Sequence, residues 1–190
     1  MARQIDIEPR MEKLAQGIGN GWANTNSRDL VFIDDILKQV KTGLCIDTTR
    51  MFAGGFSYGG GMSLALACDR PGVFRAIAPQ SGSLTLSGCK DGSKPTAILA
   101  AAGTETYASM LTAVQKFAKN NGCTVVTPPK PAAGSMKHVC TDFTGCKAGY
   151  PARWCPFDAG HIAAPTDGQT SDNGDKTWLP AEIWKFYTQF

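Results

Sequence analysis

Apolar residues recur at helical spacing in several parts of the chain. In Asp29–Lys41 and in Tyr107–Lys119 they stand three or four positions apart, a spacing that predicts amphipathic helices. Gly59–Cys68 is rich in small residues and is expected to be helical as far as Asp69-Arg70-Pro71, where proline prevents its continuation. A closing helix is expected over Ala181–Phe190, with a proline near its first turn.

Between these segments lie apolar runs that are too short for helices. The expected strands are Arg50–Gly54, Val73–Pro79, Thr96–Ala102, Val139–Phe143 and Arg153–Phe157. Strands that alternate with helices favour βαβ units and a mainly parallel sheet. The chain has 190 residues, enough for one domain with its own core and too few for two ordinary domains. We therefore expect a single α/β domain with helices flanking the sheet.

Composition and charge exclude several classes of partner. A hydrophobic content of 43% with 18% charged residues is typical of a folded globular domain. No apolar run approaches the roughly 20 residues needed to cross a bilayer. The net charge is +3, and the Lys and Arg residues are scattered, so a nucleic-acid partner is not expected. Membrane binding is not expected either.

Cysteine is the most informative residue type in the composition. The seven cysteines are Cys45, Cys68, Cys89, Cys123, Cys140, Cys146 and Cys155. The C-x₂-C spacing of zinc and redox sites does not occur. We expect at least two disulfides, one cysteine without an intrachain partner, and therefore export to an oxidising compartment. Buried thiols, or a metal near Cys140, Cys146 and His138, are the alternatives.

The first residues do not match that expectation of export. Met1–Gly17 is interrupted by charged side chains and lacks the apolar core of a signal peptide. We therefore expect the natural N-terminus to lie outside this sequence. The apolar residues of this segment neither alternate nor run together, so we also expect no central strand here.

Gly55-Phe56-Ser57-Tyr58-Gly59 matches G-x-S-x-G, the turn that exposes a nucleophilic serine between a strand and a helix. The expected strand before it and helix after it provide the required context. The turn is tight, so a Cβ at Gly55 or Gly59 is expected to strike its neighbours. The main-chain N–H of Tyr58 is the expected oxyanion donor. A glycine-rich turn with an incidental serine is the alternative.

The chain has two histidines, His138 and His161. In α/β-hydrolases the catalytic histidine follows the last core strand and precedes the closing helix. His161 stands there, whereas two expected strands still follow His138. We predict His161 as the general base, with its ring about 3 Å from the Ser57 hydroxyl. A loop histidine without a catalytic role is the alternative.

The acid that orients the histidine should lie between the serine and the histidine in chain order. The candidates are Asp69, Asp91, Glu105, Asp142 and Asp158. Glu105 alone directly follows a core strand, and glutamate can fill this role, so Glu105 is our prediction. A carboxylate at an ordinary helix start would look the same. A site without a functioning acid, and a role for Asp142 or Asp158, therefore stay open.

Several stretches together resemble the fungal feruloyl esterases of the type C group. They are Gly21-Trp22-Ala23-Asn24, Gly55-Phe56-Ser57-Tyr58-Gly59-Gly60-Gly61-Met62-Ser63, Ala67-Cys68-Asp69-Arg70-Pro71, Asn120-Asn121-Gly122-Cys123 and Gly145-Cys146-Lys147-Ala148-Gly149-Tyr150-Pro151. The resemblance implies a secreted serine esterase that releases ferulic and related hydroxycinnamic acids from arabinose side chains of xylan. Carried over, Ser57 is the nucleophile and His161, in Ala159-Gly160-His161, is the base.

Two features depart from that family. Its members carry His-Gly-Thr-x-Asp after the strand expected at Thr96–Ala102, with the aspartate as triad acid, and this sequence has Thr106 in that place. Members also run longer at the N-terminus, where early strands and an oxyanion loop lie, and residues 1–19 show no such pattern. Both departures predict weak activity.

Three interpretations follow. One is a secreted, monomeric esterase acting on feruloylated arabinoxylan or small hydroxycinnamate esters. The second is an acetylxylan esterase or polyester depolymerase on the same α/β-hydrolase-type sheet, and the third is a catalytically impaired remnant. None of them requires a metal or an organic cofactor.

Overall fold

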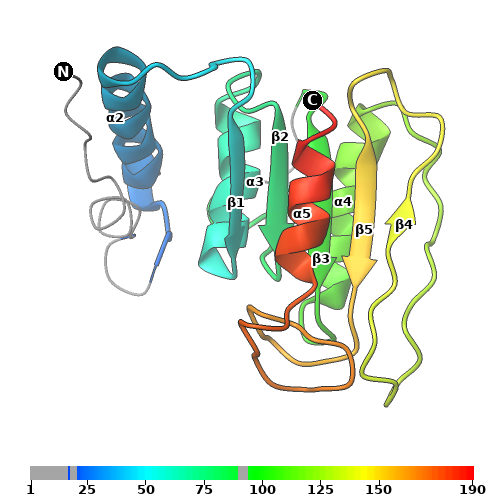
Figure 1. Ribbon diagram of the computed structural model, residues 1–190. Coiled ribbons are helices and arrows are strands. Elements are labelled where there is room, and N and C mark those ends of the chain that lie inside the picture. The colour runs from blue at the N-terminus through cyan, green and yellow to red at the C-terminus, as the bar shows by residue number, and fades with distance from the viewer. Residues whose placement is uncertain (1–16, 18–20, 90–93) are drawn as a thin grey trace.

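The computed structural model describes residues 17, 21–89 and 94–190 (Figure 1). Its elements in chain order are η1 (Thr25–Ser27), α2 (Arg28–Gly43), β1 (Phe52–Phe56), α3 (Tyr58–Asp69), β2 (Ala76–Gln80), β3 (Ala97–Ala102), α4 (Tyr107–Asn120), β4 (Thr141–Asp142), β5 (Ala152–Pro156) and α5 (Leu179–Tyr187). The expectations for residues 1–16 and for Asp91 concern residues outside this description.

The described strands form one sheet in the order β1-β2-β3-β5-β4. β1, β2, β3 and β5 are parallel, and only β4 is antiparallel to its neighbour. Figure 1 shows α5 on one face of the sheet and α3 with α4 on the other. The expected α/β-hydrolase-type architecture, a mainly parallel sheet with flanking helices, is confirmed.

Burial on both faces explains the sequence of β3, which is apolar throughout. Ile98, Ala100 and Ala102 belong to the core cluster that includes residues of α3 and α4. Ala97, Leu99 and Ala101 belong to a second cluster with Leu179 and Phe186 of α5. Side chains alternate between the two faces of a strand, so a strand covered on both sides is hydrophobic at every position.

The element types agree with the sequence-based expectation, while several boundaries differ. β1 and β2 each end later than expected, at Phe56 and Gln80. α5 begins earlier, at Leu179, with its proline in the first turn. β4 is much shorter than the expected Val139–Phe143. The flanking N–H groups of Val139 and Phe143 nevertheless bond to carbonyls of β5, to Pro156 and Ala152, so the antiparallel pairing extends beyond the regular strand.

Helix α2 lies at one side of the molecule (Figure 1). Leu30 is buried, and Ile33 and Leu37 pack against the core cluster that contains much of α3. Asp34 of α2 accepts hydrogen bonds from the guanidinium of Arg70 at the end of α3. In the described part of the chain, no helix is long and apolar enough to cross a membrane.

Candidate active site

Ser57 occupies the single residue between the end of β1 and the start of α3. Its backbone angles are φ 55° and ψ −114°, a sparsely populated combination for a non-glycine residue. Its N–H donates to the carbonyl of Gln80 at 2.9 Å, and its own carbonyl accepts from the Gly61 N–H at 3.0 Å. The strained serine is therefore held by main-chain bonds to β2 and α3.

Glycines allow the backbones to approach closely at this turn. A Cβ on Gly55 would lie 2.8 Å from the Gly59 carbonyl carbon, and one on Gly60 would lie 2.5 Å from the Gln80 carbonyl oxygen. The expectation for Gly59 is wrong, because a Cβ there would meet nothing within 4 Å. The helix turns this position away from the strand, and the close contact falls one residue later.

His161 lies on the segment between β5 and α5, beyond the carboxyl ends of the parallel strands. Its Nε2 is 2.9 Å from the Ser57 Oγ, across 104 positions of sequence. Its ring also lies against the Phe56 ring, with centroids 4.6 Å apart. The predicted distance between serine and histidine is confirmed, and the two atoms are placed for proton transfer.

Glu105 follows β3 and reaches the main chain beside the histidine. Its Oε1 accepts a hydrogen bond from the His161 backbone N–H at 3.2 Å. Within the described residues, the ring of His161 makes a hydrogen bond through Nε2 and none through Nδ1. Glu105 is thus adjacent to the pair, but its hydrogen bond is to the backbone of the histidine rather than to its imidazole.

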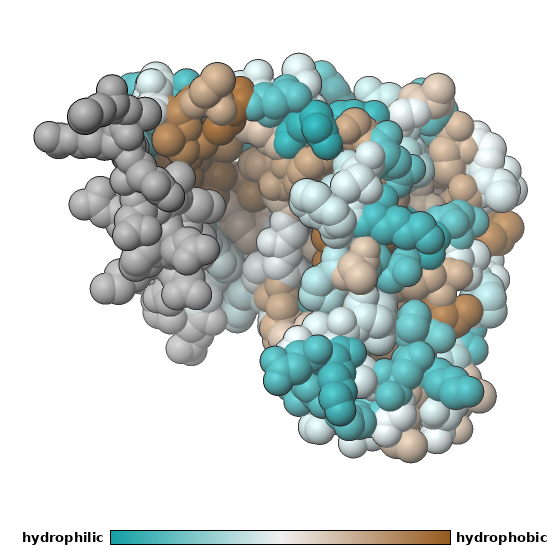
Figure 2. All heavy atoms as spheres, in the orientation of Figure 1, coloured by the Kyte–Doolittle hydropathy of each residue, from teal (hydrophilic) through white to brown (hydrophobic). Residues whose placement is uncertain are grey.

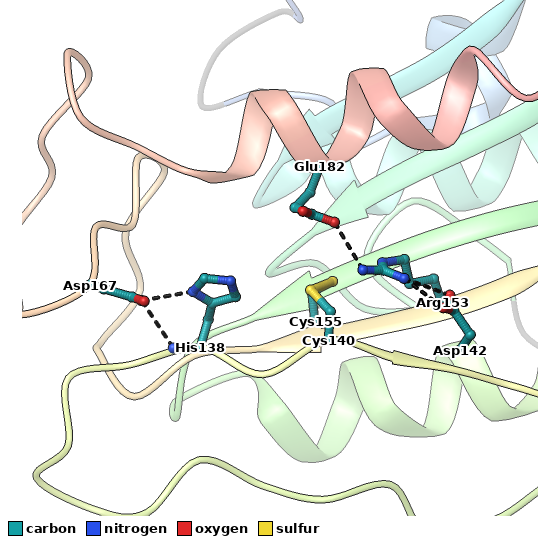
Figure 3. Close-up of a disulfide and its surroundings, with 7 residues drawn as sticks. All are labelled: His138, Cys140, Asp142, Arg153, Cys155, Asp167 and Glu182. Carbon is teal, nitrogen blue, oxygen red and sulfur yellow. Dashed lines mark hydrogen bonds and ion pairs between the residues drawn. A yellow bond between two sulfur atoms is a disulfide. The ribbon is translucent and has the colours of Figure 1, made fainter.

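None of the other described candidate acids is found in a hydrogen bond with His161. Asp142 forms an ion pair with Arg153, at 2.7 Å, and Arg153 also contacts Glu182 of α5 (Figure 3). Asp158 accepts a hydrogen bond from the Met136 N–H at 2.9 Å. Asp69 is the last residue of α3, at the opposite end of that helix from Ser57.

Thr106 stands at the start of α4. Its Oγ1 is buried and has no hydrogen-bond partner among the residues that the structure describes. This is the position at which the family resemblance places an aspartate.

The main-chain N–H of Tyr58 is at the first residue of α3. The first N–H groups of a helix have no acceptor within the helix and carry its positive end. The structure thus places the Tyr58 N–H directly after Ser57, at the positive end of α3, and its role as an oxyanion donor stays a prediction.

His138 forms no hydrogen bond with Ser57 in the described part of the chain, and it contacts instead the segment that carries His161. Its Nδ1 is 2.7 Å from the Asp167 carboxylate, and its backbone N–H bonds to the same oxygen (Figure 3). Its ring stacks on Trp178, with centroids 3.8 Å apart. Figure 2 shows the end of the molecule formed by this segment as mainly hydrophilic. Sequence reasoning missed this cluster, because no local pattern links its members.

Six of the seven cysteines are paired. The disulfides are Cys68–Cys89, Cys123–Cys146 and Cys140–Cys155, and Cys45 is free and exposed. The prediction of at least two bridges and one cysteine without an intrachain partner is confirmed. Cys140–Cys155 joins the chain just before β4 to β5 (Figure 3). In the described part of the chain, no group of three or more His, Cys, Asp or Glu side chains is arranged to hold a metal.

The sequence is similar to those of known feruloyl esterases. The chain is 44% identical over 166 residues to feruloyl esterase C of Emericella nidulans, which covers 85% of this chain and 60% of that protein. It is 36% identical over 178 residues to feruloyl esterase D of Neurospora crassa, covering 92% of this chain and 60% of that protein. The resemblance to fungal feruloyl esterases is thus confirmed. The chain spans about 60% of the length of these relatives.

A family model provides the wider classification. The model described as the prolyl oligopeptidase family matches residues 11–122. That range contains the serine turn, and it agrees with the α/β-hydrolase-type sheet described above. The chain therefore belongs to the prolyl oligopeptidase family.

Proposed function

We propose that this protein is a serine carboxylic-ester hydrolase of the feruloyl esterase type. The observation that carries the proposal is the 2.9 Å separation between Ser57 Oγ and His161 Nε2 on a strained turn between β1 and α3. Its substrates are feruloylated arabinoxylan or small hydroxycinnamate esters. The similarity to feruloyl esterases C and D supports that substrate class.

The reaction follows from the placement of the two side chains. His161 Nε2 accepts the Ser57 hydroxyl proton as the oxygen attacks the ester carbonyl, and then returns the proton to the leaving alcohol. The Tyr58 N–H donates to the oxyanion of the tetrahedral intermediate. Water, deprotonated by the same histidine, then releases the acid. Glu105 orients His161 through the backbone of the loop.

The proposal extends to the setting in which the enzyme works. Three disulfides are typical of proteins from an oxidising compartment, which supports a secreted protein. We also propose that residues 1–190 form a single catalytic domain, with residues 1–19 as a divergent N-terminal segment, and that the protein is a monomer.

A fluorophosphonate probe tests the nucleophile, because it labels only an activated serine. We expect labelling of the unmodified chain and none of Ser57→Ala. The matched control is Ser135→Ala, since among the described residues the Ser135 hydroxyl accepts a hydrogen bond only from the Lys137 N–H of its own turn. Labelling of Ser57→Ala would refute Ser57 as the nucleophile.

Substrate specificity is tested separately with purified esters. We expect methyl ferulate to be cleaved with a higher kcat/KM than acetylated xylan or a short polyester. A preference for either of the latter would replace the feruloyl assignment with the second interpretation. A chain that labels poorly and cleaves none of these esters would be the impaired remnant.

A further inference from the structure

Gln80, the last residue of β2, touches both halves of the proposed active site. Its main-chain carbonyl accepts the hydrogen bond from the Ser57 N–H at 2.9 Å. Its side-chain Nε2 donates to the carbonyl oxygens of Ile162 at 3.1 Å and Ala163 at 2.8 Å. One residue thus holds the serine turn through its backbone and the segment after His161 through its side chain.

Because Gln80 is buried, loss of its side-chain hydrogen bonds is expected to destabilise the loop. Gln80 is only 7% exposed, and every residue of β2 is buried. A primary amide has two N–H donors, and here the nitrogen serves two carbonyls of a segment without regular structure. If those donors were removed, the carbonyls would lose their partners in a partly desolvated place, which is costly. β2 also pairs with a strand on each side, so the backbone from which the Gln80 side chain extends is held in place by the sheet.

A second contact holds His161 from the other direction. The Glu105 carboxylate accepts the bond from the His161 N–H, while Gln80 holds the carbonyl of the next residue, Ile162. A side chain from β2 and one from the segment after β3 therefore form hydrogen bonds to the main chain of two consecutive residues of the loop. Neither contact involves the imidazole, so both act on the position of the ring through the backbone.

We propose that Gln80 is a positioning residue that sets the Ser57–His161 separation by coupling the serine turn to the histidine loop. The proposal rests on the proposed function, in which these two residues carry the proton transfer. It concerns the geometry of the pair rather than substrate binding, since Gln80 contacts neither reacting atom.

Gln80→Met is the main test, because methionine keeps the length and flexibility of the side chain and removes the donors. We expect kcat for 4-nitrophenyl acetate to fall about tenfold to about a hundredfold, since misplacement of a catalytic group by about 1 Å can cost that much. KM should stay within about twofold. Gln115→Met is the matched control, because the Gln115 Nε2 likewise donates to a carbonyl, that of Val126 at 3.0 Å. It should leave kcat unchanged.

A second variant and a double-mutant cycle separate positioning from packing. Gln80→Glu has the same shape but fewer donors, because its carboxyl has no donor when ionised and one O–H when protonated, against the two N–H donors of the amide. We expect it to be slower than the unmodified chain. In a His161→Ala background, Gln80→Met should cause no further loss, because residues that act through one another are not additive. Each variant is assayed well below its melting temperature.

Several results would overturn the proposal: an unchanged kcat in Gln80→Met, a Gln80→Glu variant as fast as the unmodified chain, or an equal loss with and without His161. Nuclear magnetic resonance of the histidine rings provides a readout that does not need activity. Gln80→Met should shift the ring signals of His161 and leave those of His138 in place. If the unmodified chain proves inactive, the proposed function fails, and an unshifted His161 ring would then refute the role of Gln80 independently.

Discussion

The carboxylate of Glu105 accepts a hydrogen bond from the main-chain N–H of His161 at 3.2 Å. The ring nitrogen Nε2 of the same histidine lies 2.9 Å from the Ser57 Oγ. In serine hydrolases the acid bonds instead to the other ring nitrogen, where it selects the tautomer and stabilises the imidazolium. The two arrangements predict different consequences of removing the charge at residue 105.

Glu105→Gln and Glu105→Ala distinguish these arrangements. If Glu105 acts through the main chain, the amide oxygen of glutamine still accepts the N–H bond, and kcat should stay within about threefold. Glu105→Ala removes the acceptor and should lower kcat about tenfold, by displacement of the loop. Steady-state hydrolysis of methyl ferulate measures both. A much larger loss in Glu105→Gln would instead identify Glu105 as a charged triad acid.

Thr106→Asp should increase activity. The Thr106 Oγ1 is buried without a hydrogen-bond partner in the described part of the chain, and the family resemblance places a triad aspartate at this position. A carboxylate that holds the imidazole can be worth up to about ten-thousandfold in kcat, so we expect a gain of at least about tenfold. Thr106→Asn is the control, because it has the same shape without the charge. Equal rates for the two variants would contradict the prediction.

Gly55→Ala should destabilise the serine turn, whereas Gly59→Ala should not. A Cβ at Gly55 would lie 2.8 Å from the backbone of Gly59, while one at Gly59 meets nothing within 4 Å. We expect Gly55→Ala to lower the free energy of unfolding by about 1–3 kcal/mol, the usual cost of overpacking, as measured by urea denaturation. Equal stability of the two variants would show that the turn can relax.

Titration of the denatured, unreduced protein should find one thiol per chain. Cys45 is free and exposed, whereas the other six cysteines are paired. Cys45→Ser should reduce the count to zero, which serves as the control. Seven thiols in the purified protein would remove the support for secretion.

Asp34→Asn should weaken the attachment of α2 in a pH-dependent way. The hydrogen bond from Arg70 lowers the pKa of Asp34 below its ordinary value of 3.8. A carboxyl with a lowered pKa in the folded state stabilises it above the unfolded pKa, and this contribution is lost as the pH falls through the folded pKa. The Asp34 side chain is 42% exposed, so we expect less than about 1 kcal/mol at pH 7.

The stability difference between Asp34→Asn and the unmodified chain should disappear in acid, at about pH 2. Urea denaturation at the two pH values measures it. Asp35→Asn is the matched control, because it removes the same charge from the same helix, and no ion pair is found for Asp35 within the described residues. A difference that persists in acid would show that the effect is not electrostatic.

Much of the scaffold could be predicted from local patterns. Apolar spacing identified α2 and α4, and short apolar runs identified the parallel strands, because the burial of a helix face or of both strand faces is recorded in neighbouring residues. The serine turn was also predictable from a local pattern. The close backbone approach that requires glycine at position 55 and the exposed serine at Ser57 both fall within one five-residue motif. The order of serine and histidine along the chain then indicated His161.

Only the tertiary structure decided how the histidine is held. Gln80 reaches Ile162 across 82 positions, Glu105 reaches His161 across 56, and His138 reaches Asp167 across 29. A hydrogen bond depends on the direction of a donor and an acceptor in space, and no spacing along one segment records a partner on another. For the same reason, the sequence identified Glu105 as a neighbour of the histidine, whereas the packing of the loop determined that its bond is to the backbone and not to the ring.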